Sequence, residues 1–340
     1  MHRSWQWLLG LLVSVIALVL VFQGVQLSEL WVALQNAQYG WLVPALTCVW
    51  LGQWLRAHSW RVILGHSLTH QEVFSALNAG YLLNNVLPLR LGELGRAYLI
   101  SRTGKMTVSQ ALSSVVVERV VDLCMVSAFL VALLPTLAFP GWAINAVGMA
   151  IALVALGLTA LYVMVTQREW MLKLVRWVVR APLGFWQGAA RLEDIAEAFI
   201  DGLQAIREPR RFILAAVFSG LAWFSAGASL SFILLAFQVS ADVLMIGVMG
   251  YFTLAVTALS IALPSAPGSL GVWQWAVVLA LSVFGVAREA ALSVAILHHA
   301  ANYAVTSVLG ALALAWEHES LTHLAQSARS LLGKTTARRV

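Results

Sequence analysis

Three groups of polar and charged residues interrupt long apolar stretches of this sequence. The first surrounds Pro88 and contains Asn84, Asn85, Arg90, Glu93 and Arg96. On a helix, Arg90, Glu93 and Arg96 recur every third residue and therefore lie on adjacent turns. Guanidinium groups match phosphate in bidentate geometry, and two of them against one carboxylate leave a surplus of positive charge. This spacing predicts phosphate binding. The alternative is a structural network that neutralises itself.

The second group consists of Glu118, Arg119 and Asp122. The two carboxylates are four residues apart and share a helix face. Inside a membrane span a carboxylate costs free energy unless it is paired or hydrated, so it marks a functional site by default. We expect Arg119 or the arginines of the first group to be the partners. A purely structural interhelical pair is the competing interpretation.

The third group follows the break Pro264-Ser265-Ala266-Pro267-Gly268 and includes Ser269 and Gln274. We expect a new helix to begin at about Ser269, with its free N–H groups and positive dipole end directed into the break. Such an end suits an anionic group such as a phosphodiester. Opposite the break we place four polar residues of the last apolar stretch: His298, His299, Asn302 and Tyr303.

The composition shows where these groups must lie. Hydrophobic residues make up 61% of the 340 residues and charged residues 11%, against roughly 45–50% and about 25% in soluble domains. The chain has too few charges to cover a water-exposed surface, which excludes the soluble and disordered classes. We therefore predict an all-α polytopic membrane protein.

Six stretches are long enough to cross a bilayer as helices, which takes about 20 apolar residues. They are residues 5–25, 39–64, 108–134, 142–166, 212–237 and 290–316. Two further stretches, 72–101 and 243–284, are broken by proline and glycine, which stop a helix or permit a sharp turn. We predict that both are re-entrant helical hairpins, although the first arm of 243–284 is itself long enough to span.

The basic residues test this topology. With the N-terminus in the cytosol, every Lys and Arg of the 21 except Arg288 falls on or toward the cytosolic side, as the positive-inside rule requires. Each hairpin is then flanked by two spans, and the two three-part units have opposite orientation. Inverted repeats built around broken helices are typical of transporters.

The domain organisation follows from this topology. Residues 1–316 form the transmembrane domain. Residues 168–211 form a cytosolic elbow whose first helix is amphipathic and lies on the inner headgroups, with Glu193, Asp194, Glu197 and Asp201 on a solvated face of the second. Residues 317–340 form a basic cytosolic tail. We interpret the elbow as an anchor between two bundles, with a partner-binding site as the alternative.

The three groups in this order resemble the flippase-like family of the lysylphosphatidylglycerol synthase transmembrane region. The resemblance rests on the patterns that begin at Leu87, Glu118 and Pro264, and it covers roughly residues 8–316. It implies movement of phospholipids, including aminoacylated ones, between leaflets. Gln274 and His299 depart from the family, in which Glu and Arg are common at these places; a neutral hydrogen-bonded pair would then replace a charged one. The chain has no room for the soluble synthase domain.

We therefore expect a flippase in the plasma membrane, with both termini cytosolic, that moves a phosphate-bearing lipid. Its partners would be anionic or phosphate-bearing phospholipids and not nucleic acid, and a homodimer is possible. No P-loop motif occurs, so movement would be downhill or driven by a gradient. We expect no enzymatic activity, cofactor or metal. The alternatives are an enzyme or accessory acting on polyprenyl-phosphate-linked sugars, and a structural membrane protein. The substrate-binding residues would be Asn85, Arg90, Glu93, Arg96, Glu118, Arg119, Asp122, Ser269, Gln274 and His299.

Overall fold

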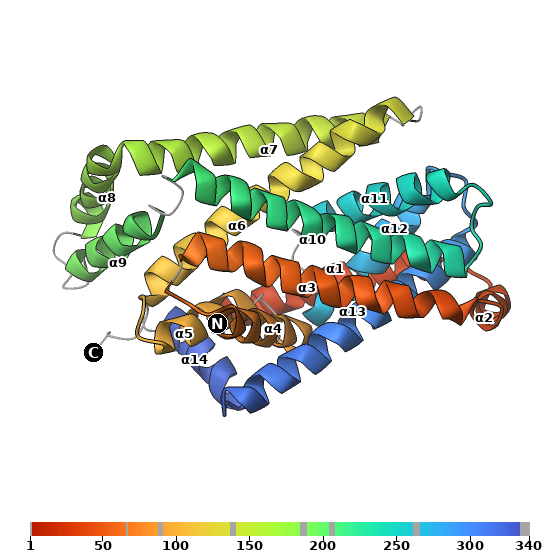
Figure 1. Cartoon of the computed structure of the whole chain (residues 1–340), viewed down its shortest axis with the longest axis horizontal. Coiled ribbons are helices and arrows are strands. Elements are labelled where there is room, and N and C mark those ends of the chain that lie inside the picture. Colours follow the sequence, from red (N-terminus) through yellow and green to blue (C-terminus); the bar gives the residue numbers. More distant parts are fainter. Residues whose placement is uncertain are drawn as a thin grey trace.

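The computed structural model describes residues 2–65, 67–87, 91–136, 141–183, 189–203, 208–260 and 266–333, and the regular elements in these ranges are all helices (Figure 1). The α-helices are α1 (His2–Phe22), α2 (Leu27–Gln35), α3 (Leu42–Leu64), α4 (His70–Val86), α5 (Gly92–Arg102), α6 (Val108–Leu133), α7 (Gly141–Thr166), α8 (Arg168–Leu183), α9 (Ala189–Gly202), α10 (Pro209–Ala236), α11 (Val243–Ser260), α12 (Val272–Ser282), α13 (Arg288–Trp316) and α14 (Leu321–Gly333). Short 3₁₀ turns occupy η1 (Tyr39–Trp41), η2 (Leu134–Thr136) and η4 (Pro267–Ser269). The predicted all-α polytopic fold is confirmed.

The six predicted spans correspond to α1, α3, α6, α7, α10 and α13. Among the described residues, α10, α11 and α13 are long and apolar enough to cross a membrane, and two sharply bent pairs, α1 with α2 and α7 with α8, raise the number of candidate spans to five. Helix α6 is 26 residues long but carries three charged residues near its middle. The inverted-repeat arrangement stays a prediction.

The first predicted span, residues 5–25, corresponds to α1, and the structure adds a sharp turn at the end of this helix. Helix α1 ends at Phe22, and the chain turns by 84° into α2. Gly24 makes this turn possible because its φ of +79° is accessible to glycine at little cost. The apolar run conceals the turn, since Val25 and Leu27 continue the hydrophobic pattern on its far side.

Both predicted hairpins are pairs of helices. The first consists of α4 and α5, which pack side by side, with residues 88–90 outside the described part of the chain. The second consists of α11 and α12, joined through η4, with residues 261–265 outside the described part. Helix α12 begins at Val272 and not at the predicted Ser269, because Gly268, Ser269 and Gly271 all have positive φ, which a right-handed helix excludes.

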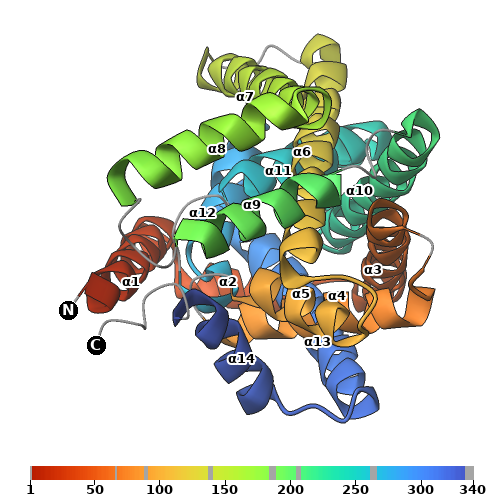
Figure 2. The ribbon, with the colours of Figure 1, turned by 90° about the vertical axis from the view of Figure 1, so that its left-hand side faces the viewer.

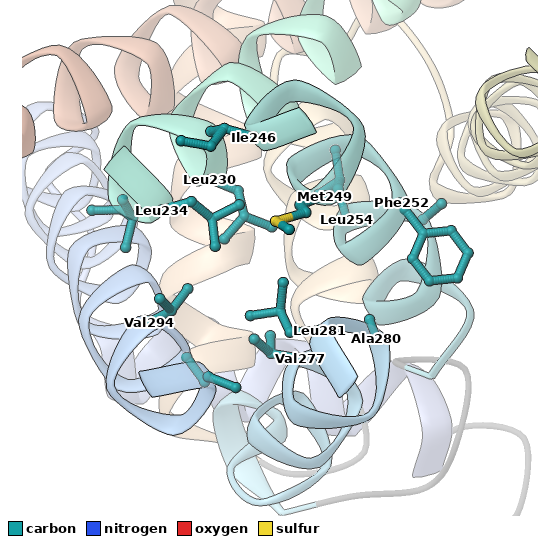
Figure 3. Close-up of a cluster of buried hydrophobic side chains, with 14 of the residues drawn as sticks. Leu230, Leu234, Ile246, Met249, Phe252, Leu254, Val277, Ala280, Leu281 and Val294 are labelled. Carbon is teal, nitrogen blue, oxygen red and sulfur yellow. The ribbon is translucent and has the colours of Figure 1, made fainter. Parts of the chain in front are cut away.

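The largest hydrophobic core lies between α10, α11, α12 and α13 (Figure 3). Leu230 and Leu234 of α10 meet Met249 of α11, and Leu281 of α12 packs near Val294 of α13. A second core joins α3, α4, α5, α6 and α14. Each hairpin is therefore embedded among longer helices.

Helices α8, α9 and α14 cluster at one end of the bundle, which faces the viewer in Figure 2. Arg168 joins α8 to α9 through ion pairs with Glu197 (2.9 Å) and Asp201 (2.8 Å). Both carboxylates also remain accessible, with side chains 46% and 33% exposed, on the face of α9 that the sequence predicts to be solvated. The predicted tail contains α14, which packs on α5.

Candidate functional site

Five charged side chains from three helices meet inside the bundle, and we call them the charged cluster. Arg56 of α3 bonds both oxygens of Asp122 at 2.9 and 3.1 Å. Arg96 of α5 pairs with Glu118 at 2.7 Å. Arg119 of α6 bridges Glu118 (2.8 Å) and Asp122 (3.4 Å). The structure thus confirms that Arg119 and a hairpin arginine are partners of the two carboxylates.

The charged cluster lies deep in the bundle. Glu118, Asp122 and Arg96 are 2%, 6% and 4% exposed, whereas the Arg119 side chain is 41% exposed. Asp122 is 14 residues into α6 and 11 from its end, which places it about 21 Å and about 16 Å from the two ends. Three guanidinium groups face two carboxylates, so the cluster carries a surplus of one positive charge.

Tryptophans hold this arrangement from two sides. The Arg96 guanidinium lies 4.5 Å from the centre of the Trp60 ring, a cation–π contact, and Trp60 donates to Ser114 Oγ at 2.9 Å. On the other side Trp223 of α10 donates to Asp122 Oδ1 at 2.8 Å. Asp122 therefore accepts bonds from α3 and α10 in addition to its contact with Arg119.

Two donors of the charged cluster are unused. The Nε–H groups of Arg96 and Arg119 are buried and have no hydrogen-bond acceptor. Buried donors without an acceptor are uncommon in folded proteins and call for an explanation. Together with the surplus charge, they indicate a cluster with capacity for a further anionic acceptor.

Hairpin one positions Arg96 by a close backbone approach. Asn84 Oδ1 accepts the Gly92 N–H at 2.8 Å, which caps α5 across the break. A Cβ atom added at Gly80 would lie 2.8 Å from Gly92 O and 3.2 Å from the Arg96 Cβ. The glycines let α4 and α5 touch, and Arg96 is then directed toward α6. Glu93 is half-buried and does not pair with Arg96.

A second set of polar side chains surrounds the break of hairpin two, and we call it the neutral cluster: Asn85, Gln274, His299 and Tyr303. Gln274 Oε1 accepts the Gly271 N–H at 2.7 Å, and Gln274 Nε2 lies 2.9 Å from His299 Nδ1. This is the neutral hydrogen-bonded pair that the sequence suggested. Because Gln274 takes the Gly271 N–H, that donor of the helix end is not free for an anion.

The tips of the two hairpins meet at the neutral cluster. Tyr303 of α13 donates to the backbone oxygen of Asn85 at 2.8 Å, and a Cβ added at Gly268 would lie 2.9 Å from the Tyr303 ring. The Asn85 amide donates to Thr306 Oγ1 at 3.0 Å and also to Ser307. The polar tip of hairpin one is therefore joined to α13 and lies beside η4.

Helix α1 closes the far side of this break. Ser14 is 2% exposed, and its hydroxyl accepts the Ala266 N–H at 2.8 Å. This bond satisfies a backbone donor freed by the interruption of the helix. From the sequence, α1 is predicted only to cross the membrane, and its contact with the break is a finding of the structure.

Seven of the ten predicted site residues fall into two networks, and Glu93 belongs to neither. Glu118, Arg119, Asp122 and Arg96 form most of the charged cluster, and Asn85, Gln274 and His299 belong to the neutral cluster. Ser269 lies in η4 next to the neutral cluster, and Arg90 is outside the described residues. Within the described ranges, no hydrogen bond or ion pair joins the side chains of the two clusters.

The family model for the lysylphosphatidylglycerol synthase TM region matches residues 7–310. This protein belongs to that family. Both clusters lie within the matched residues.

Two curated relatives extend this result. Glycosyltransferase AglD of Haloferax volcanii is 28% identical in an alignment of 330 positions that covers 88% of this chain and 53% of AglD. The UPF0104 membrane protein MJ1078 of Methanocaldococcus jannaschii is 23% identical over 68% of this chain and 92% of its own length. The chain therefore spans about half the length of AglD. No solved structure matches.

Sequence analysis missed one member of the charged cluster, Arg56, and the two tryptophans that contact this cluster. Arg56 is interpreted from the sequence only as a basic residue at a cytosolic boundary, although it lies inside α3, eight residues before Leu64. The signal that could have found it is its depth, since a charged residue inside a span is a functional candidate by default. Trp60 and Trp223 carry no such signal, because tryptophan is common in spans.

Proposed function

We propose that this protein moves a phosphate-bearing lipid headgroup between the two leaflets of the membrane. The observation that carries the proposal is the surplus guanidinium charge of the charged cluster, with its unused Nε–H donors, at mid-length of α6. A phosphodiester supplies one negative charge and several acceptor oxygens. It would neutralise the surplus and fill the empty donors.

The exposure of the arginines suggests an order of contacts. Arg119 is the most exposed arginine of the cluster, while Arg96 is 4% exposed. A headgroup phosphate would meet Arg119 first and then compete with Glu118 for Arg96. The guanidinium then exchanges a carboxylate oxygen for a phosphate oxygen, so no charge is left unpaired inside the bundle. Because carboxylate and phosphate bind arginine in similar geometry, the exchange needs only a small movement of the side chains.

The same proposal includes the location of the protein. The cytosolic placement of both termini and of α8 and α9 follows from the distribution of basic residues. Membrane phospholipids with anionic or phosphate-bearing headgroups are the proposed partners, in the plasma membrane, and the protein is not itself an enzyme. A gradient or downhill exchange would supply the energy.

The test is a lipid-exchange assay with the purified full chain in liposomes. Acyl-labelled fluorescent phosphatidylglycerol is bleached from outside with dithionite, and movement appears as additional bleaching. Arg119→Gln and Arg96→Gln should slow movement by about tenfold or more, since each removes a charge-assisted hydrogen bond worth about 1.5–3 kcal/mol. Arg119→Lys should retain part of the rate, because it keeps the charge and loses the planar fork.

A matched control is Arg102→Gln on the same helix as Arg96. Arg102 pairs with Glu319 outside the charged cluster, so its loss should leave movement unchanged. Unchanged movement in a folded Arg119→Gln protein would refute the binding role. Folding is checked by size-exclusion chromatography and melting temperature.

AglD favours a second candidate, in which the protein serves the transfer of lipid-linked sugars. The match covers 53% of that relative, which is named a glycosyltransferase. This role predicts turnover of a polyprenyl-phosphate sugar by the purified chain that is lost in Asp122→Asn. Movement of the same lipid without chemical change would instead support transport.

A further inference from the structure

We propose that the neutral cluster binds hydroxyl groups of the transported headgroup, and that the substrates are phosphate-bearing lipids whose headgroups carry hydroxyls. This inference rests on the proposed function and names its substrate class. It starts from two hydrogen-bonding atoms beside Gln274 and His299 that the charged cluster does not explain.

The first of these atoms is Trp273 Nε1 and the second is His298 Nδ1; both are buried without a hydrogen-bond partner. The His298 residue is 2% exposed. The two rings stack at 5.7 Å with an angle of 14° between their planes, and the Trp273 ring lies 5.6 Å from that of His299. An unfilled donor and an unfilled imidazole nitrogen thus lie in one small region, next to the contact between the hairpin tips.

The chemistry of this pair selects the ligand. An indole N–H can only donate, so the group that fills it must accept. An ammonium group has no acceptor and cannot do this. A hydroxyl accepts from the indole and can donate to the unprotonated nitrogen of a neutral imidazole. A hydroxyl is therefore the group that suits both atoms.

The neighbouring side chains have the same character. The side chains that hydrogen-bond or stack within the neutral cluster and at the adjoining break, in the described part of the chain, are all amide, imidazole, phenol, indole or hydroxyl groups: Ser14, Asn85, Trp273, Gln274, His299, Tyr303, Thr306 and Ser307. No Asp or Glu takes part in these contacts to pair with a cationic headgroup. The surroundings therefore favour neutral polar atoms over a second charge.

The two clusters are close enough along α4 to act on one headgroup. Gly80 of α4 lies against Arg96 of the charged cluster, since a Cβ added at Gly80 would be 3.2 Å from the Arg96 Cβ. Asn85, whose backbone oxygen accepts from Tyr303, follows Gly80 by five residues, a rise of about 7.5 Å along the helix. A phosphate near the arginines and hydroxyls at the hairpin tips thus fit a headgroup such as glycerol, inositol or a sugar phosphate.

The experiment compares lipids with and without hydroxyl groups in the headgroup. Phosphatidylglycerol and phosphatidyl-n-propanol, with the same fluorescent acyl chain, are assayed in liposomes containing the full chain. Polyprenyl-phosphate glucose and polyprenyl phosphate form the second pair. We expect about tenfold faster movement of the hydroxyl-bearing member in at least one pair. A hydrogen bond to a buried donor that is otherwise unfilled changes a binding constant by about this factor. The pair that discriminates identifies glycerol or sugar as the source of the hydroxyl.

The variant Trp273→Phe keeps the ring and removes the donor, so it should reduce this preference to about twofold or less while movement of the propanol lipid continues. His298→Phe tests the second atom in the same way. The matched control is Trp275→Phe on the same helix, which packs in a separate hydrophobic cluster with Val21 and Leu292 and should keep the preference.

Three outcomes separate the inference from the proposed function. Equal movement of both members in both pairs overturns the hydroxyl assignment and leaves phosphate transport intact. A preference that survives both Trp273→Phe and His298→Phe also overturns the assignment. If the wild-type protein moves none of the four lipids, the proposed function itself fails, and the inference fails with it.

Discussion

The charged and neutral clusters solve the same problem, polar groups inside an apolar bundle, in different ways. In the charged cluster Glu118 pairs with three arginines and Asp122 with two, and Asp122 also accepts from Trp223. In the neutral cluster Gln274 completes its bonds with one backbone group and one imidazole. Ionic groups need many partners because burying a charge costs far more than burying an amide. The chain therefore keeps its buried ion pairs and its neutral hydrogen-bonded groups in two separate clusters.

The largest effect should come from breaking an ion pair of the charged cluster. Glu118→Gln leaves Arg96 buried with a neutral partner, and loss of one member of a buried pair costs about 3–5 kcal/mol. Melting temperature in detergent should fall markedly. If the melting temperature falls no further than in Gln274→Leu, the charged cluster does not depend on its partners more strongly than the neutral cluster, and the comparison is wrong.

The next effect tests how hairpin one holds Arg96. Gly80→Ala places a methyl group 2.8 Å from Gly92 O, so α4 and α5 must separate. Overpacking of this kind costs about 1–3 kcal/mol, and lipid movement should slow because Arg96 shifts away from Glu118. The control is Gly148→Ala in α7, where a Cβ meets no atom within 4 Å. Equal melting temperatures of the two variants would refute the role of the close approach.

A smaller loss is expected in the neutral cluster. Gln274→Leu leaves the Gly271 N–H and one His299 nitrogen without partners, which costs about 1–3 kcal/mol. The loss should not depend on ionic strength, since no charge is removed. Thermal unfolding at low and high salt checks this. A strong salt dependence would show that the region is not electrically neutral.

The smallest effect concerns a cap outside the membrane-spanning helices. Glu72 is partly buried, which raises its pKa, but bonds from Lys105 and Thr69 outweigh the burial and hold the pKa below its ordinary value of 4.5. Its contribution to stability is therefore present above pH 4.5 and is lost as the pH falls through the lower folded value. Glu72→Gln should melt about 1–3 °C lower at pH 7, and this difference should shrink as the pH falls below 4.5. A difference that stays constant as the pH falls would contradict this.

The sequence predicted helix boundaries well where proline and glycine residues mark them. Pro88 and the segment from Pro264 to Gly268 end helices for local reasons, so both hairpins could be found. The turn at Gly24 could not, because a single glycine in an apolar run also occurs inside helices. The start of α12 was placed at Ser269, three residues early, since positive φ at Ser269 depends on its contacts in the fold and not on its type.

The candidate site was predicted in part. Glu118, Arg119 and Asp122 were recognisable because charges inside a span are expensive. From the sequence, Arg56 is assigned to the cytosolic boundary of its span. The depth of a residue in a span can be judged only when both ends of the helix are known. The pairing of Arg96 with Glu118 instead of Glu93 depends on how hairpin one packs on α6, and no local pattern encodes that packing.

The C-terminal helix α14 has a consequence for measuring movement in this protein. Leu324 is fully buried against the α5 side of hairpin one, beside Gly95, and Glu319 just before the helix pairs with Arg102. Helix α14 is thus attached to the segment that carries Arg96. Spectroscopic labels on the exposed residues of α14, such as Gln326, would therefore report any displacement of that hairpin without altering the arginines themselves.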